Sequence, residues 1–322
     1  LLLRWTLPDP ESAASIVDEL DAAQALAGNP SQHFSTRAEL AIRAGRNKDA
    51  TAAAARLMEE NRELGSVAMG WAVLHGAKHP DPRSLDAVSP EDALVLAARK
   101  PASKRADLLQ TASTLESWQA KVLLTALSPT ALLTIQAAEN VPETPEAQLA
   151  LATALVQRSD LPRAEIAPFL VAGARAAESL GLGSQSLSLG QAAIDALLHA
   201  HDAPGAVALA QELMQGRLTV GDGTGGAMLS RSAVDAALRA GDLRAALDLA
   251  RLGERMGELA QEKPAWEEAA WGLARAARAA RDSAELSRAI PLLEGEQRSA
   301  AAAMFATLNG QRPETLSLPK DL

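Results

Sequence analysis

The chain has 322 residues and a net charge of −9, and 48% of its residues are apolar although only 2% are aromatic. Alanine dominates the apolar set, while tyrosine and cysteine are absent. A β-sandwich or β-barrel needs a supply of Val, Ile, Thr and aromatic residues, so this composition excludes such folds and predicts an all-α protein. Because each buried alanine removes little area from water, the core must be spread over many close helix contacts.

Several classes of site and partner are excluded in the same way. Without cysteine there are no disulfides, cysteinyl metal sites or thiol nucleophiles. The negative net charge argues against direct binding to nucleic acid, and the apolar runs are too short to span a membrane. The chain begins with Leu1 rather than Met, which suggests a segment upstream. A cytoplasmic location is slightly favoured over a periplasmic one.

Proline directly after a capping residue marks four helix starts in the first half. Proline at the first helical position loses no hydrogen bond, and the preceding side-chain oxygen caps free amides. The four pairs are Asp9-Pro10, Ser89-Pro90, Ser128-Pro129 and Thr144-Pro145. Together with the apolar periodicity they predict short-looped helices. The ranges are 10–27, 32–44, 48–63, 66–77, 90–100, 103–115, 116–127, 129–139 and 145–158.

The second half of the chain repeats itself. Residues 233–242 align with residues 193–202 at an offset of 40, and residues 273–282 follow at the same offset. Repeats of this length are typical of a solenoid. An aspartate ends each repeated segment, and we expect it to be the N-cap of the next helix. These aspartates are Asp160, Asp202, Asp242 and Asp282.

Residues 237–250 read Ala-Leu-Arg-Ala-Gly-Asp-Leu-Arg-Ala-Ala-Leu-Asp-Leu-Ala, which resembles the turn and second helix of a tetratricopeptide repeat. Ile42-Arg-Ala-Gly45 is similar in the first half. The resemblance implies a right-handed α-solenoid of antiparallel helix hairpins in one continuous array. Within it we expect irregular hairpins in 1–140, regular repeats of about 40–42 residues in 141–295, and a capping helix and tail in 296–322.

Three features depart from that family. The period exceeds the roughly 34 residues of a tetratricopeptide repeat, the aromatic positions hold Ala, Leu or Val, and the turn glycine is replaced by Ser159, His201 and Arg281. Since arginine adopts the left-handed conformation less readily than histidine, we expect a differently shaped turn before Asp282. The additional residues of each repeat are assigned to loops in 181–190, 216–226 and 257–264.

One of these loops holds Gly221-Asp-Gly-Thr-Gly-Gly226, which satisfies the dinucleotide-binding pattern G-x-G-x-x-G. Such a site needs a parallel strand before the loop and another after the helix, and no such alternation surrounds it. No Walker lysine follows. We therefore interpret residues 221–226 as a flexible loop between repeats and predict no cofactor.

Histidines and acids give no complete catalytic or metal site. His75 and His79 are one helical turn apart and could share a metal, but Pro80 ends the helix there and no third ligand is evident. We interpret them as histidines at a helix end, where imidazolium interacts with the helix dipole. No G-x-S-x-G motif is present. The sequence predicts a protein without catalytic residues and without a metal.

The best candidates for partner binding lie on one predicted helix near the C-terminus. Trp266 and Trp271 flank its start, and tryptophan is enriched at binding hot spots. Arg275 and Arg278, with Arg281, form a basic arc that an acidic peptide or a phosphate would match.

Three functions remain open. The first is a non-catalytic scaffold that binds a peptide or helix of another protein on its solenoid surface. The second is a helical sensor or regulatory module of a larger bacterial transcription or signalling protein, because arrays with Ala-Gly-Asp-Leu turns resemble such effector domains. The third is a small-molecule binder or an enzyme built at the loops between repeats.

Overall fold

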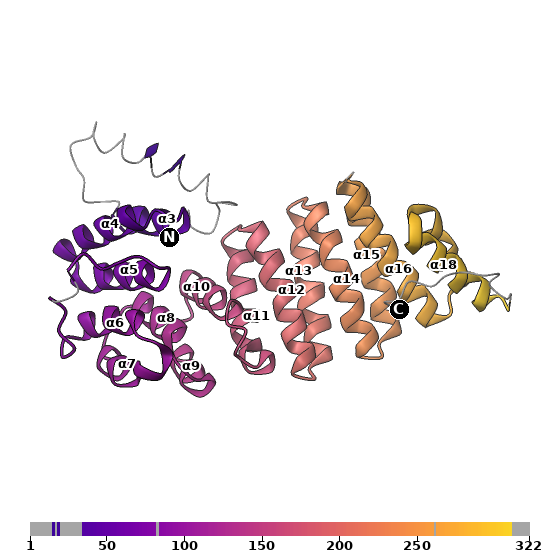
Figure 1. The fold of residues 1–322 in the computed structure, drawn as a ribbon. Helices are drawn as coiled ribbons and strands as arrows, with labels where there is room; N and C mark the ends of the chain where they lie inside the picture. The colour runs from indigo at the N-terminus through magenta and orange to yellow at the C-terminus, as the bar shows by residue number, and fades with distance from the viewer. Residues whose placement is uncertain (1–14, 17, 20–33, 82–83, 261, 311–322) are drawn as a thin grey trace. The chain divides into compact units, whose positions relative to one another are not determined.

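A computed structural model describes residues 15–16, 18–19, 34–81, 84–260 and 262–310. From Phe34 onward the described residues form sixteen α-helices and no strand, which confirms the all-α prediction (Figure 1). Most helices pack against the next one in the chain between Phe34 and Ala138 and again between Arg163 and Leu308, as in a helical repeat protein. The contacts group into two compact units, Leu1–Pro162 and Arg163–Leu322, here called unit 1 and unit 2.

Eight of these α-helices belong to unit 1. They are α3 (Phe34–Arg43), α4 (Asn47–Glu60), α5 (Arg62–Leu74), α6 (Pro90–Arg99), α7 (Ala106–Ala112), α8 (Trp118–Leu127), α9 (Ala131–Ala138) and α10 (Pro145–Val156), with a short 3₁₀ helix at Ala102–Lys104. The predicted helix 10–27 lies largely outside the described residues. The other eight ranges match these helices to within several residues, because apolar periodicity and short loops are both visible in the sequence.

The proline signals locate two of the helix starts correctly. Ser89 and Thr144 are N-caps with proline in the first turn of α6 and α10. Ser128 instead ends α8, and the N-cap of α9 is Thr130, whose hydroxyl accepts the Leu133 N–H at 3.4 Å. The predicted start at Ser128-Pro129 was therefore too early.

Helices of unit 1 also touch beyond their immediate neighbours. The helix α5 packs on α3 and on α8, and α8 packs on α10. Gly70 lies at the crossing of α5 and α8, where an added Cβ would come within 2.6 Å of Leu123 Cδ2. The glycine thus permits a close approach of two backbones. The contacts α3–α5, α5–α8 and α8–α10 join these four helices in unit 1 (Figure 1).

Unit 2 is more regular than unit 1. Its helices are α11 (Arg163–Ser179), α12 (Gly183–His199), α13 (Ala203–Thr219), α14 (Gly223–Arg239), α15 (Leu243–Ala260), α16 (Lys263–Ala280), α17 (Ser283–Ala289) and α18 (Gly295–Leu308), with a 3₁₀ helix at Ile290–Leu292. The starts of α11 to α17 are evenly spaced along the chain, from Arg163 to Ser283. One repeat of the sequence is therefore two helices of nearly equal length.

This regularity corrects the placement of the additional residues. The segments 181–190, 216–226 and 257–264 consist mostly of helix, whereas loops were expected there. The repeats are longer than the tetratricopeptide period because each helix is long, with 17 or 18 residues in α11 to α16.

A left-handed residue separates successive helices at the same spacing. Gly181, His201, Gly221, Gly241 and Arg281 all have φ between 57° and 76°. In each turn the residue after the left-handed one donates its backbone N–H to the carbonyl five residues earlier, for example Asp282 to Ala277 at 2.8 Å. The expectation of a different turn at Arg281 was wrong, because the helices on both sides impose the same turn on arginine as on glycine.

Three of the four predicted aspartate caps are confirmed. The Oδ1 atoms of Asp202, Asp242 and Asp282 accept backbone N–H groups in the first turn of the following helix. Asp160 is not a cap; both of its carboxylate oxygens accept from the Arg158 guanidinium at 2.7 Å, and α11 begins only at Arg163. The interruption by Pro162 explains the difference, since it shifts the helix start past Asp160.

The helices of unit 2 form two layers. Each helix contacts the next one in the chain, and contacts also join α12, α14 and α16 to one another in sequence and α11, α13 and α15 likewise. Polar pairs between alternate helices reinforce this pattern. They are Arg175 with Glu212, Gln191 with the Met228 carbonyl, and Arg231 with Glu268.

Candidate functional site

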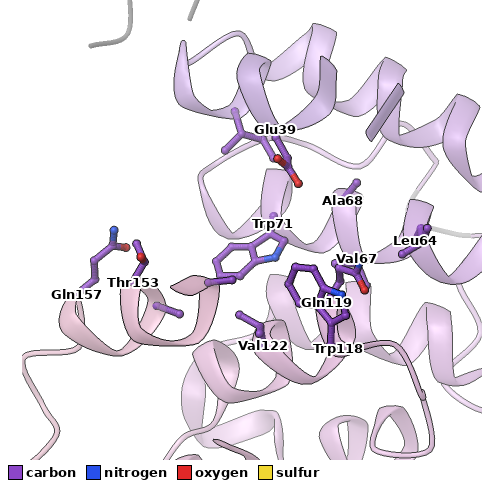
Figure 2. Close-up of a pocket in the computed structure, with 13 residues that line it drawn as sticks. Glu39, Leu64, Val67, Ala68, Trp71, Trp118, Gln119, Val122, Thr153 and Gln157 are labelled. Atoms are coloured by element: carbon purple, nitrogen blue, oxygen red, sulfur yellow. The ribbon is translucent and has the colours of Figure 1, made fainter. Parts of the chain in front are cut away.

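Four helices of unit 1 line a pocket that holds two of the five tryptophans in the chain. Figure 2 shows the side chains, which come from α3, α5, α8 and α10. The pocket has a volume of about 50 Å³. Its lining consists of Glu39, Ile42, Leu64, Val67, Ala68, Trp71, Trp118, Gln119, Val122, Ala150, Thr153, Ala154 and Gln157. We call it the tryptophan pocket.

Trp71 occupies the middle of this pocket in the view of Figure 2. It follows Gly70 on α5, so the close crossing with α8 brings the indole beside Val122 and the rest of that helix. The indole is half-buried, and its ring centroid lies 6.0 Å from that of His75 one turn later. The close crossing at Gly70 thus places the Trp71 indole against α8.

Trp118 is placed by the cap of α8. It is the first residue of the helix, and the preceding Ser117 accepts the Ala120 N–H at 3.2 Å as N-cap. The Ser117 N–H in turn donates to Glu63 Oε1 on α5 at 2.8 Å. Because Ser117 is hydrogen-bonded both to α5 and to the first turn of α8, the Trp118 indole is held next to the helix that carries Trp71.

The polar groups of the pocket are few. Glu39 is its one ionisable lining side chain, and Gln119, Thr153 and Gln157 add neutral polar groups. The Thr153 hydroxyl donates to the Leu149 carbonyl at 2.9 Å, which leaves its oxygen able to accept. The pocket is therefore mostly apolar and aromatic, with acceptor groups and one negative charge, a composition typical of binding sites.

Neither Trp71 nor Trp118 was among the residues predicted to bind a partner. The available signal was the position of each tryptophan: one follows a glycine inside a helix and the other follows a capping serine. Neither signal shows that the two helices are neighbours in space, because α6 and α7 come between them in the chain.

The predicted partner-binding residues all lie on α16. Trp271, Arg275 and Arg278 are spaced by four and three positions, so they share one face of the helix. Trp266 lies before them on the same helix and points about 140° away from Trp271. It is 37% exposed and packs over Gly257 of α15, where an added Cβ would lie 2.6 Å from its Cδ1. The structure thus brings three of the four together.

Acidic residues partly neutralise the expected basic arc. Arg275 forms an ion pair with Asp235 of α14 at 2.5 Å. Arg281 is the left-handed cap after α16 rather than part of its face. Arg278 is exposed, and within the described part of the chain its guanidinium forms no ion pair comparable to that of Arg275. It is the member of the arc most open to an acidic partner.

The glycine-rich segment serves helix packing. Gly223, Gly225 and Gly226 belong to the first turn of α14, so the expectation of a flexible loop was wrong. An added Cβ at Gly223 would lie 2.5 Å from the Met256 carbonyl oxygen on α15. The Gly225 N–H already donates to Asp222, the N-cap. The glycines thus let α14 approach α15 closely, and helix packing accounts for small residues at these positions.

His75 and His79 do not share a helix. The helix α5 ends at Leu74 with His75 as its C-cap, because Gly76 takes a φ of 95°. His79 lies beyond the helix and accepts the Asp81 N–H at Nδ1, and burial lowers its pKa. No group of three or more metal-ligating side chains comes together anywhere in the described ranges.

Among the helices that the structure describes, none combines the length and apolar character needed to cross a membrane.

No protein-family model matches the chain, and no curated protein has a significantly similar sequence.

Proposed function

We propose that the chain is a protein-interaction module and that it holds a segment of a partner protein at the tryptophan pocket. The observation that carries this proposal is the pairing of Trp71 and Trp118, from helices that are not consecutive, in one partly open pocket. Tryptophan is the residue type most enriched at hot spots of protein interfaces. In a chain with 2% aromatic residues, two indoles in one pocket are a concentration of binding area.

The fold supports the same proposal. The even spacing of helices and left-handed turns in unit 2 is what a divergent tetratricopeptide-like array would show. We therefore infer a right-handed α-solenoid of antiparallel hairpins. Proteins of this architecture present long surfaces lined by successive helices, which suit an extended or helical peptide.

The purified 322-residue chain can be used to select peptides from a random display library. We expect the selected peptides to bind at least about tenfold more weakly when Trp71→Leu or Trp118→Ala is introduced, the loss of one hot-spot side chain. Trp266→Leu is the matched control, because it removes an exposed indole in unit 2. Thermal melting of each variant verifies that it remains folded.

Two outcomes would contradict the proposal: a library without binders, or binders that tolerate both pocket variants. Peptides that depend on Trp271 instead would assign binding to the face of α16 that carries Arg275 and Arg278. That face is the second candidate, favoured by the exposed Arg278.

A further inference from the structure

Part of the apolar lining of the tryptophan pocket stays in contact with solvent. Trp71 and Trp118 are half-buried (Figure 2), and so are Ile42 of α3 and Leu64 of α5. An apolar segment that covers these side chains removes their exposed area from water, which is the main favourable contribution to such contacts. The pocket therefore favours an occupant with several large apolar side chains.

The first residues of the chain have this composition. Residues 1–7 read Leu-Leu-Leu-Arg-Trp-Thr-Leu, so five of the seven are leucine or tryptophan. They lie outside the residues that the structure describes. Pro8-Asp9-Pro10 follows them, a turn sequence that separates them from the predicted helix 10–27. Residues 1–7 are thus a short apolar segment of the same chain with the composition that the pocket favours.

An ion pair attaches the N-terminal part of the chain close to the pocket. Residues 15–16 and 18–19 are helical. The Arg46 guanidinium donates to both carboxylate oxygens of Asp18, at 2.6 and 3.1 Å. Arg46 is the N-cap of α4 and comes four positions after Ile42, which lines the pocket. The ion pair thus joins the segment before α3 to the end of α3 that contributes to the pocket.

The same ion pair indicates the direction of the segment. The predicted helix 10–27 should run antiparallel to α3, because only residues 28–33 lie between them. The pairing of Asp18 with a residue just after α3 fits this direction. Residue 10 then lies toward the end of α3 that carries Ile42. The nine residues before it span up to about 30 Å when extended, about twice the length of α3, so residues 1–7 can fold back over the pocket.

We infer that residues 1–7 bind in the tryptophan pocket of their own chain and that a partner segment must displace them. The displacement rests on the proposed function, whereas the contact does not. Trp5 and the leucines cover Ile42, Leu64 and the two indoles, and they take the place of a partner peptide. The N-terminal segment therefore lowers the affinity of the pocket for a partner.

A spin label tests the contact. The chain contains no cysteine, so Leu2→Cys gives a single attachment point for a nitroxide, which broadens the NMR signals of nearby protons. The label is attached to the ¹⁵N-labelled 322-residue chain, and the indole N–H signals are assigned with single Trp→Phe variants. We expect the signals of Trp71 and Trp118 to broaden relative to the same chain with the label chemically reduced.

The matched control carries the same label together with Leu3→Ser and Trp5→Ser. It keeps the connection to α3 but loses two apolar side chains, so the broadening of the Trp71 and Trp118 signals should fall. Equal broadening in the two chains would show that the connection alone brings the label near the pocket, and it would overturn the inference. Sharp Trp71 and Trp118 signals in the labelled chain would overturn it as well.

Peptide binding tests the displacement. Display peptides are selected on the 322-residue chain with Leu3→Ser and Trp5→Ser. They should bind about tenfold more weakly to the unaltered chain if residues 1–7 fill the pocket in about nine of ten molecules. Leu316→Ser with Leu318→Ser, a matched change near the other end of the chain, should leave the affinity unchanged.

The two experiments separate this inference from the proposed function. Peptides that depend on Trp71 and Trp118 but bind equally with and without residues Leu3 and Trp5 would overturn the inference while the proposed function stands. If the label broadens both indole signals but no peptide binds either chain, the proposed function is contradicted and the contact of residues 1–7 with the pocket is supported.

Discussion

Arg217 of α13 lies buried against Glu178 of α11, and its guanidinium also contacts Asp222, the N-cap of α14, at 3.1 Å. Ser186 of α12 donates to the same glutamate at 2.6 Å. The side chain of Arg217 is only 4% exposed. The buried cation thus joins α11, α13 and α14 directly, and Ser186 adds α12 through the shared glutamate.

Replacement of Arg217 by leucine should lower the free energy of unfolding by about 3 kcal/mol, because it leaves two carboxylates next to an apolar side chain. Urea denaturation of the 322-residue chain measures the change. The control is Arg175→Leu, which breaks an exposed pair with Glu212 and should cost less than about 1 kcal/mol. If both variants lose the same free energy of unfolding, the buried ion pair stabilises the protein no more than the exposed pair does.

Residues with positive φ offer a stabilising change. Arg281 and His201 have φ values of 57° and 59°, a conformation that costs side-chain-bearing residues about 1 kcal/mol relative to glycine. Arg281→Gly and His201→Gly should therefore each raise the midpoint of urea unfolding. Gly241→Ala, which places a side chain at the equivalent turn with φ of 73°, should lower it. A lower midpoint in both glycine variants would contradict this account.

Two glycines of unit 2 should respond oppositely to alanine. At Gly223 an added Cβ meets the backbone of α15 at 2.5 and 2.7 Å, so Gly223→Ala should destabilise the protein by about 1–3 kcal/mol. At Gly272 the Cβ meets only Val234 Cγ2, at 3.6 Å. Gly272→Ala should stabilise by up to about 1 kcal/mol, because alanine is the better helix former. Thermal melting of both variants and of the unaltered chain measures these two changes in stability.

Glu254 gives a pH dependence. Burial raises the pKa of this carboxyl, and Glu258 and Glu285 act in the same direction, while Arg288 opposes them. The folded state therefore holds the proton more tightly than the unfolded chain does. Its contribution to stability is present in acid, below the ordinary glutamate pKa, and is lost as the pH rises through the raised pKa.

The variant Glu254→Gln removes this titration. Its stability relative to the unaltered chain should increase as the pH is raised from about 4 to about 7. Urea midpoints at several pH values measure the difference. Glu59→Gln, which changes an exposed carboxylate on α4, is the matched control. A constant difference for Glu254→Gln across this range would contradict the prediction.

The sequence by itself determined the helical class and most of the helix positions. Alanine content and apolar periodicity predict helices from residues that are close together in the sequence. The aspartates at 202, 242 and 282 act in the same way, because an N-cap bonds to amides only two or three residues later. The repeat in the second half could also be read directly. That each 40-residue repeat consists of two long helices of nearly equal length was hidden, because Gly221 and the glycines after it had the composition of a loop.

Tertiary structure alone decided which residues meet. Gly223 belongs to a helix because α15 packs against it, and Arg281 adopts a left-handed turn because both flanking helices fix its ends. Trp71 and Trp118 share a pocket since Gly70 lets α8 approach α5, past the two helices between them in the chain. A contact between distant segments depends on the shapes of both surfaces, and one sequence shows those surfaces only after the backbone is placed.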